Sequence, residues 1–134
     1  MAKTTQDLVM EAMGQVEAIS PAGLRAELEA GDVRLIDVRE PMEWEQHIGG
    51  AIQIPRGLLE FVADPECGSR LPESLRIGLG SSERVVVYCN TGGRGALAAH
   101  TLKVMGYERV ANLEGGLAAW REAGLPITEH YGAL

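Results

Sequence analysis

A cysteine followed by a glycine-rich turn is the stretch of this sequence best suited to chemistry. Cys89 stands directly after the apolar, β-branched run 85–88, which is typical of a buried strand. From Ala96 onward, apolar residues recur at helical spacing, so we expect a helix there. Between the two lie Asn90, Thr91, Gly92, Gly93, Arg94 and Gly95. A thiol on a turn from a strand into a helix occupies the edge of an open α/β sheet where ligands bind.

The residue types in this turn favour an anion. Three glycines in four positions let the backbone approach a ligand closely, and successive N–H groups with a helix N-terminus form an anion cradle. We expect the Cys89 thiol to ionise readily there and to act as a nucleophile. Arg94, a cation in the first helical turn, is unfavourable by about 0.3–1 kcal/mol when exposed. It is therefore expected to face an anionic ligand or the thiolate. A buried cysteine without a chemical role is the alternative interpretation.

Three motifs, in this order along the chain, resemble those of rhodanese-type sulfurtransferases. Stretch 89–99, CNTGGRGALAA, resembles the active-site loop of that family. Stretch 35–55, which contains LIDVRE, Glu43-Trp44 and HIGGAIQIP, resembles its first half. Stretch 113–126, LEGGLAAW followed by GLP, resembles its C-terminal signature. Together the motifs cover roughly residues 15 to 128.

The resemblance implies a sulfurtransferase in which Cys89 is catalytic. Its thiolate attacks the sulfane sulfur of an anionic donor such as thiosulfate, and a cysteine persulfide remains. Cyanide or a thiol, which can belong to a partner protein, then accepts the outer sulfur. The backbone from Asn90 to Gly95 would hold the charge of the persulfide, while Arg94 attracts the donor. Relatives often carry Ser where Gly95 stands, so a water or a backbone N–H replaces that hydroxyl here, or activity is weaker.

Two alternatives remain open at this point. One is a phosphatase or arsenate reductase on the same fold, for which the resemblance implies a loop of the form Cys-X5-Arg. The spacing from Cys89 to Arg94 is Cys-X4-Arg, one residue shorter. The other is a non-catalytic sulfur-relay or protein-binding module. The presence of both residues argues against an inactive domain, but it is compatible with a relay that turns over small molecules poorly.

The elements expected around the turn make a doubly wound α/β domain. Five short strands alternate with helices, which indicates a mainly parallel five-stranded sheet with helices on both faces. The strands are expected at 15–19, 33–38, 51–54, 85–88 and 109–113. We expect an N-terminal helical extension over 1–14, a rhodanese-like domain over 15–128 and a short C-terminal tail over 129–134.

Four other positions carry side chains capable of chemistry. Asp37 and Arg39 follow a strand and would lie at the same sheet edge as Cys89; we favour a structural pair that fixes the loop. The resemblance implies that His47 is a structural loop histidine. Cys67, in the irregular stretch 64–82, could resolve a persulfide on Cys89, but a passive thiol is favoured.

Length, charge and cysteine content limit the classes of function. With 134 residues the chain is expected to form one domain. Its net charge is −7, from 12 basic and 19 acidic residues, without a basic stripe, which excludes nucleic acid as an expected partner. Two cysteines make no disulfide framework, and the N-terminus lacks a long apolar core, so we expect a cytoplasmic protein without a membrane span. No metal-ligand spacing or cofactor motif is present.

Overall fold

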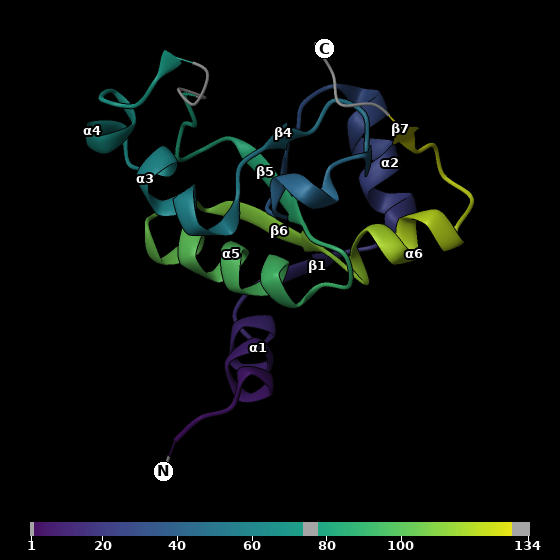
Figure 1. The fold of residues 1–134 in the computed structure, drawn as a ribbon, viewed down its shortest axis with the longest axis horizontal. Coiled ribbons are helices and arrows are strands. Elements are labelled where there is room, and N and C mark those ends of the chain that lie inside the picture. Colours follow the sequence, from purple (N-terminus) through teal and green to yellow (C-terminus); the bar gives the residue numbers. More distant parts are fainter. Residues whose placement is uncertain (1, 74–77, 130–134) are drawn as a thin grey trace.

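A parallel five-stranded sheet forms the centre of the computed structural model, which describes residues 2–73 and 78–129 (Figure 1). Its strand order is β1-β6-β5-β2-β4, and every neighbouring pair is parallel, as predicted. The strands are β1 (Glu17–Ile19), β2 (Arg34–Asp37), β4 (Ile52–Gln53), β5 (Arg84–Tyr88) and β6 (Arg109–Leu113). Apart from Glu129, the predicted tail 129–134 lies outside the described residues.

Local capping signals explain where the helices begin and end. The Ser20 hydroxyl accepts a hydrogen bond from the Gly23 N–H at the start of α2, and Gly31 ends that helix at φ 88°. Thr4 caps α1 through a capping box with Asp7. The helices are α1 (Thr5–Met13), α2 (Pro21–Ala30), α3 (Leu59–Ala63), α4 (Pro65–Gly68), α5 (Gly93–Val104) and α6 (Gly116–Glu122), with 3-10 turns η1 (Pro41–Glu43) and η2 (Arg56–Leu58).

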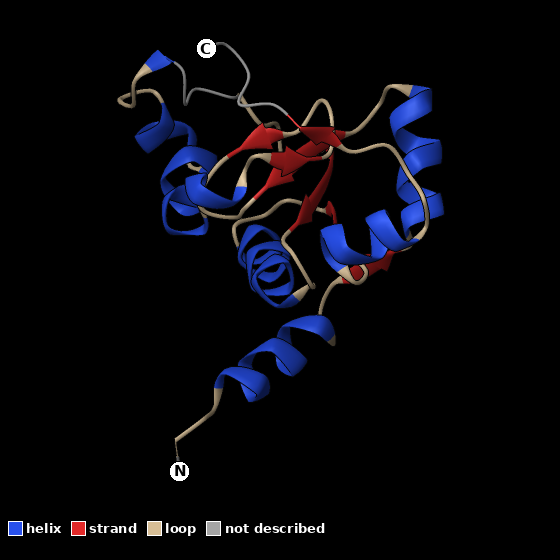
Figure 2. Ribbon diagram, turned by 45° about the vertical axis from the view of Figure 1, so that its right-hand side comes forward, coloured by secondary structure: helices blue, strands red, loops and turns tan. Residues whose placement is uncertain are grey.

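The central strand β5 divides the core into two layers, because its side chains alternate between the faces of the sheet. Val85, Val87 and Cys89 pack with residues of α3 and α5. Val86 and Tyr88 pack on the other face, against α2 and α6. Figure 2 shows the sheet between these two groups of helices. Cys89 therefore continues the buried register of β5 and stands at the sheet's carboxyl edge.

Three features of the fold lie outside the layers or were too short to predict. The pairs Gln46–His47 (β3) and Thr128–Glu129 (β7) form a small antiparallel sheet. The four-residue helix α4 follows α3 directly. Helix α1 projects from the body below α5 (Figure 1). Two- to four-residue elements show no periodicity in a sequence, so nothing predicted β3, β7 or α4.

In the described ranges, no helix is long and apolar enough to span a membrane.

Candidate active site

Cys89 lies where β5 turns into α5, and two backbone donors point at its sulfur. The N–H groups of Gly92 and Gly95 donate hydrogen bonds to Sγ over 3.1 and 3.2 Å. Gly92 adopts φ 115°, a conformation that residues with a side chain avoid, and this turns the chain from the loop into α5. The Cys89 side chain is buried. Two N–H groups of the glycine-rich turn are therefore directed at the thiol.

The start of α6 holds the same loop from its other side (Figure 1). The Leu117 N–H donates to the Cys89 carbonyl over 2.8 Å, and the Ala118 N–H donates to the Asn90 carbonyl over 2.9 Å. A Cβ at Gly116 would overlap with the Cys89 carbonyl oxygen, and Gly116 has φ 61°. Only glycine permits this approach without strain. The glycine pair of the C-terminal motif thus serves the Cys89 loop.

Arg94 forms an ion pair with Glu43 of η1. Its Nη1 and Nη2 lie 2.7 and 2.9 Å from the two carboxylate oxygens, a bidentate geometry. These hydrogen bonds hold the pKa of Glu43 at about 2 and raise the pKa of Arg94. The sequence predicted that Arg94 faces an anion, and the anion in this structure is a carboxylate of the same chain. Glu43 also offsets the cation at the N-terminus of α5.

A polar network, exposed at Asn90 and buried at its sheet end, connects this pair to the sheet. Asn90 donates from Nδ2 to Glu43 over 3.0 Å and accepts at Oδ1 from Arg39 over 3.1 Å. Arg39 in turn binds both oxygens of Asp37, at 3.0 and 2.9 Å. Both members of this second pair are buried. Asp37 and Arg39 form the structural pair that the sequence favoured, and they orient Asn90, the residue after the nucleophile.

Tyr88 and His47 complete the support of the loop. The Tyr88 hydroxyl donates to Asp37 over 3.0 Å and accepts from the Ile48 N–H over 3.1 Å. Burial, followed by the Asp37 charge, raises the pKa of Tyr88, so the hydroxyl remains protonated. His47 Nδ1 lies 2.9 Å from the Trp44 carbonyl oxygen, a backbone contact that agrees with the structural role expected of it.

Asn112, near the carboxyl end of β6, lies beneath the start of α5. Its Nδ2 donates to the Gly92 carbonyl over 3.1 Å, which fixes the turn. Its Oδ1 is buried, has no hydrogen-bond partner among the described residues, and lies against Gly95. The space for a serine side chain at position 95 is therefore filled by Asn112. Of the replacements expected for the missing hydroxyl, the Gly95 N–H is the donor that reaches Sγ.

A comparison with known protein families identifies the family of this chain. A family model described as "Rhodanese-like domain" matches residues 20–123. The chain belongs to the rhodanese-like domain family. The match runs from α2 to α6, leaves out only β1 of the five-stranded sheet, and includes Cys89, Arg94, Glu43 and the glycine pair at 115–116.

Individual relatives of this rhodanese-like domain differ in length. This chain is 38% identical over 104 residues to a probable adenylyltransferase/sulfurtransferase MoeZ of Mycobacterium tuberculosis. The match covers 76% of this chain but only 24% of that protein. It is 39% identical over 97 residues to a sulfurtransferase of Allochromatium vinosum, covering 72% of the chain and 78% of that protein. The chain thus spans about a quarter of the Mycobacterium protein and most of the Allochromatium protein.

A solved structure matches this rhodanese-like domain over almost its whole length. It is a protein of unknown function from Rhodopseudomonas palustris, named a possible tyrosine phosphatase. It has a TM-score of 0.80 and 34% identity, and the match covers 95% of this chain and 96% of that one. The match supports the fold, including the part outside residues 20–123.

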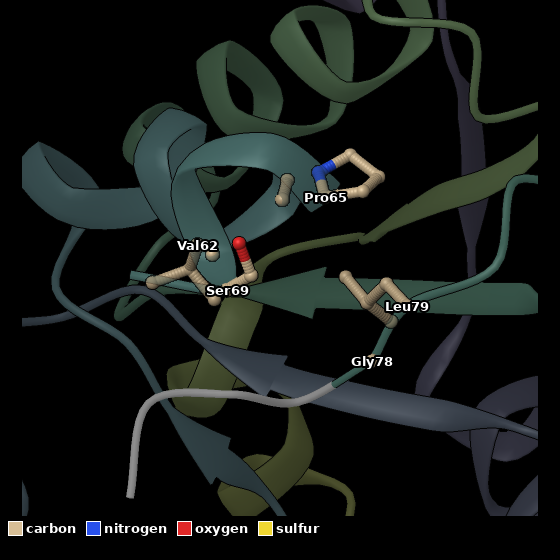
Figure 3. A pocket seen from close by; sticks show the side chains of 7 residues that line it. Val62, Pro65, Ser69, Gly78 and Leu79 are labelled. Carbon is tan, nitrogen blue, oxygen red and sulfur yellow. The ribbon is translucent and has the colours of Figure 1, made fainter. Parts of the chain in front are cut away.

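The second cysteine of the rhodanese-like domain lies on α4, beyond α3 and away from the start of α5 (Figure 1). A hydrogen bond to Asp64 raises the pKa of the Cys67 thiol, which disfavours the reactive thiolate. Beside it lies a cavity of about 240 Å³ between α3, α4 and residues 78–79, with a mostly apolar lining (Figure 3). Neither feature contacts the Cys89 loop in the described part of the chain.

Three residues of the site escaped prediction as site residues: Glu43, Asn112 and Gly116. Asn112 had a visible signal, because it is a polar residue inside the apolar strand 109–113. Glu43 and Gly116 were visible only as members of family motifs. Thr91, by contrast, was predicted for the site, and its side chain is exposed on the loop. Among residues 2–73 and 78–129 no three metal-ligating side chains cluster.

Proposed function

We propose that this rhodanese-like domain is a sulfurtransferase that carries a sulfane sulfur on Cys89. The observation that carries the proposal is the pair of N–H donors, from Gly92 and Gly95, that converge on Sγ at the start of α5. Such donors favour negative charge on the sulfur. That charge is present in the thiolate before transfer and on the outer sulfur of the persulfide after it.

In the first step, the Cys89 thiolate attacks the sulfane sulfur of an anionic donor such as thiosulfate. The new bond joins Sγ to the transferred sulfur, and the S–S bond of the donor breaks. Sulfite leaves with the electron pair of that bond, so Cys89 becomes a persulfide anion and no external oxidant or reductant is needed. The free N–H groups of the loop between Asn90 and Gly95 are the proposed donors to the oxygens of the bound substrate.

In the second step, the acceptor attacks the outer sulfur of the persulfide. Cyanide leaves as thiocyanate, and a thiolate leaves as a new persulfide; in both cases the Cys89 thiolate is restored. The acceptor thiol can belong to a partner protein, which would make the domain a relay. This alternative is supported by the Mycobacterium relative, in which the matched region is a small part of a longer protein. A working thiol needs a reducing compartment, for which we propose the cytoplasm.

A phosphatase is the second candidate, since the similar Rhodopseudomonas protein is named a possible tyrosine phosphatase. Two features weigh against it here. The loop from Cys89 to Arg94 has four intervening residues rather than the five that phosphate-binding loops of this fold carry. Arg94, which a phosphate would need, is bound to Glu43 by both of its terminal nitrogens.

Steady-state kinetics with thiosulfate and cyanide test the proposal. Covalent transfer through Cys89 predicts thiocyanate formation with parallel lines in double-reciprocal plots, the ping-pong pattern. A relay predicts slow thiocyanate formation but fast persulfide transfer to a protein thiol. Hydrolysis of an aryl phosphate, without sulfur transfer to any acceptor, would overturn the proposal in favour of the phosphatase.

A further inference from the structure

The charges around the Cys89 loop are balanced, although the sequence led us to expect that Arg94 faces an anionic ligand or the thiolate. Arg94 is bound by Glu43 and Arg39 by Asp37. A shallow depression beside the loop, lined in part by Glu43 and Asn90, also contains Arg121 and Glu45. The two guanidinium groups at the loop itself, those of Arg94 and Arg39, are thus each paired with a carboxylate, while Arg121 donates to the side-chain oxygen of Gln46. A donor approaching Cys89 therefore meets a neutral entrance with one carboxylate, Glu43, held at the loop itself.

Several hydrogen bonds hold the Glu43 carboxylate in one position. Its two oxygens accept from Arg94, and the Asn90 amide adds a third hydrogen bond over 3.0 Å. The backbone N–H of Glu40 donates to Oε1 over 3.0 Å and closes the η1 turn. The Glu43 side chain is 23% exposed and that of Arg94 is 39% exposed, so solvent and small solutes reach the pair.

We propose that Glu43 is a specificity-determining residue that makes the site select sulfane donors of low charge over dianions; this rests on the proposed sulfurtransferase function. A dianion such as thiosulfate either displaces Glu43 from Arg94, breaking two charge-assisted hydrogen bonds, or binds at the loop without a free guanidinium, because Arg94 stays paired with Glu43. A monoanionic donor carries less charge that needs a free cation, so the Glu43–Arg94 pair disfavours it less. The site is therefore suited to an organic sulfane donor, such as the persulfide of a thiol, more than to thiosulfate.

A pair of donors that differ in charge but not in chemistry tests this inference. Thiosulfate is a dianion, and methanethiosulfonate is a monoanion. Attack of the thiolate breaks the same kind of S–S bond in both donors, and methanesulfinate leaves from methanethiosulfonate. In Glu43→Gln we expect kcat/KM for thiosulfate to rise about five- to thirtyfold, and its ratio to that for methanethiosulfonate to rise about three- to tenfold. Glu45→Gln is the control, because it removes an equal charge two residues away without touching Arg94.

The outcomes separate the inference from the proposed function. An unchanged donor ratio in Glu43→Gln, or an equal rise in Glu45→Gln, overturns the role of Glu43 while persulfide formation in the wild type keeps the function. Absence of a Cys89 persulfide with both donors overturns both. If the variant unfolds, salt dependence of the wild type decides. A neutral entrance predicts that kcat/KM for thiosulfate does not fall as salt increases, whereas a steep fall reveals a free cation and contradicts the inference.

Discussion

Asn112 and Gly95 share one space beneath the Cys89 loop. A Cβ at Gly95 would overlap with Oδ1 of Asn112 and would lie 3.2 Å from its Cγ. Asn112 is buried, and its Nδ2 is bonded to the Gly92 carbonyl, so it has little freedom to move aside. The glycine at position 95 and the asparagine at position 112 therefore belong together, and the departure from the serine that relatives often carry has a steric reason.

We predict that Gly95→Ala lowers the free energy of unfolding by about 1–3 kcal/mol, because it overpacks a buried site. Gly93→Ala is the matched control in the same helical turn. There a Cβ would make ordinary contact, 3.7 Å from Val9 Cγ2, and φ is not positive. This control should leave stability unchanged or raise it by up to about 1 kcal/mol. Urea unfolding of both variants provides the comparison.

The cause of that loss is tested by the double variant Gly95→Ala, Asn112→Ala. Removing the Asn112 amide makes room for the new methyl group, so the double variant should be more stable than the sum of the single changes predicts. We expect a coupling of about 1 kcal/mol or more. Additive effects would mean that the two residues do not compete for the same space.

Tyr88→Phe should destabilise the protein by about 1–3 kcal/mol, since it leaves the buried Ile48 N–H without its acceptor and takes a donor from Asp37. The ring itself remains, so the packing of the core around α2 and α6 is kept. Chemical denaturation measures the effect. A loss below about 0.5 kcal/mol would show that water or a local shift satisfies these groups, and that the network is less tightly built than its distances indicate.

The Glu43–Arg94 pair gives the stability a defined pH dependence. The pKa of Glu43 in the folded protein, about 2, lies below its ordinary value of 4.5. The stabilisation is therefore fully present above the unfolded pKa and is lost as the pH falls toward the folded pKa. Because the pair is partly exposed, we expect no more than about 1 kcal/mol.

Wild type and Arg94→Ala, compared over a pH series, isolate this contribution. The difference in unfolding free energy between wild type and Arg94→Ala should be constant above about pH 5 and should shrink below it. Melting curves at each pH provide the measurement. A difference that stays constant down to about pH 3, or grows there, would assign the effect of Arg94 to something other than Glu43.

The architecture followed from the sequence because its signals are local and repeated. The β-branched run 85–88, the Ser20-Pro21 helix start and the glycine at 31 each specify an element within a few residues. The order of elements then implied a parallel sheet, and its carboxyl edge placed Asp37, Arg39 and Cys89 together. The antiparallel pair β3 and β7 was missed, since two-residue strands more than 80 positions apart leave no local pattern.

The partners within the site were less accessible to prediction. That Arg94 needs an anion followed from its position at a helix N-terminus, but the choice between a ligand and Glu43 depends on how η1 packs against the loop. Similarly, the effect of Gly95, on α5, depended on Asn112, a residue 17 positions further along the chain on β6. Both are tertiary contacts, and neither charge nor periodicity encodes them.

The assignment of the two cysteines predicts opposite results for equivalent changes. Cys89→Ser should abolish sulfur transfer from thiosulfate to cyanide, because serine is nearly isosteric but cannot carry a persulfide. Cys67→Ser should keep most of the activity, since α4 lies away from the Cys89 loop (Figure 1). Thiocyanate formation by the folded variants, verified by circular dichroism, measures both. The reverse pattern would move the reactive thiol to α4.

The most direct measurement is the mass of the Cys89 peptide after incubation of the intact protein with thiosulfate. A persulfide adds one sulfur atom, about 32 Da, and a reducing agent removes it again. We predict this reducible adduct on Cys89 and its absence from the Cys67 peptide. An unmodified Cys89 after treatment with both thiosulfate and an organic thiosulfonate, in a protein shown to be folded and reduced beforehand, would contradict the account of Cys89 as the sulfur carrier.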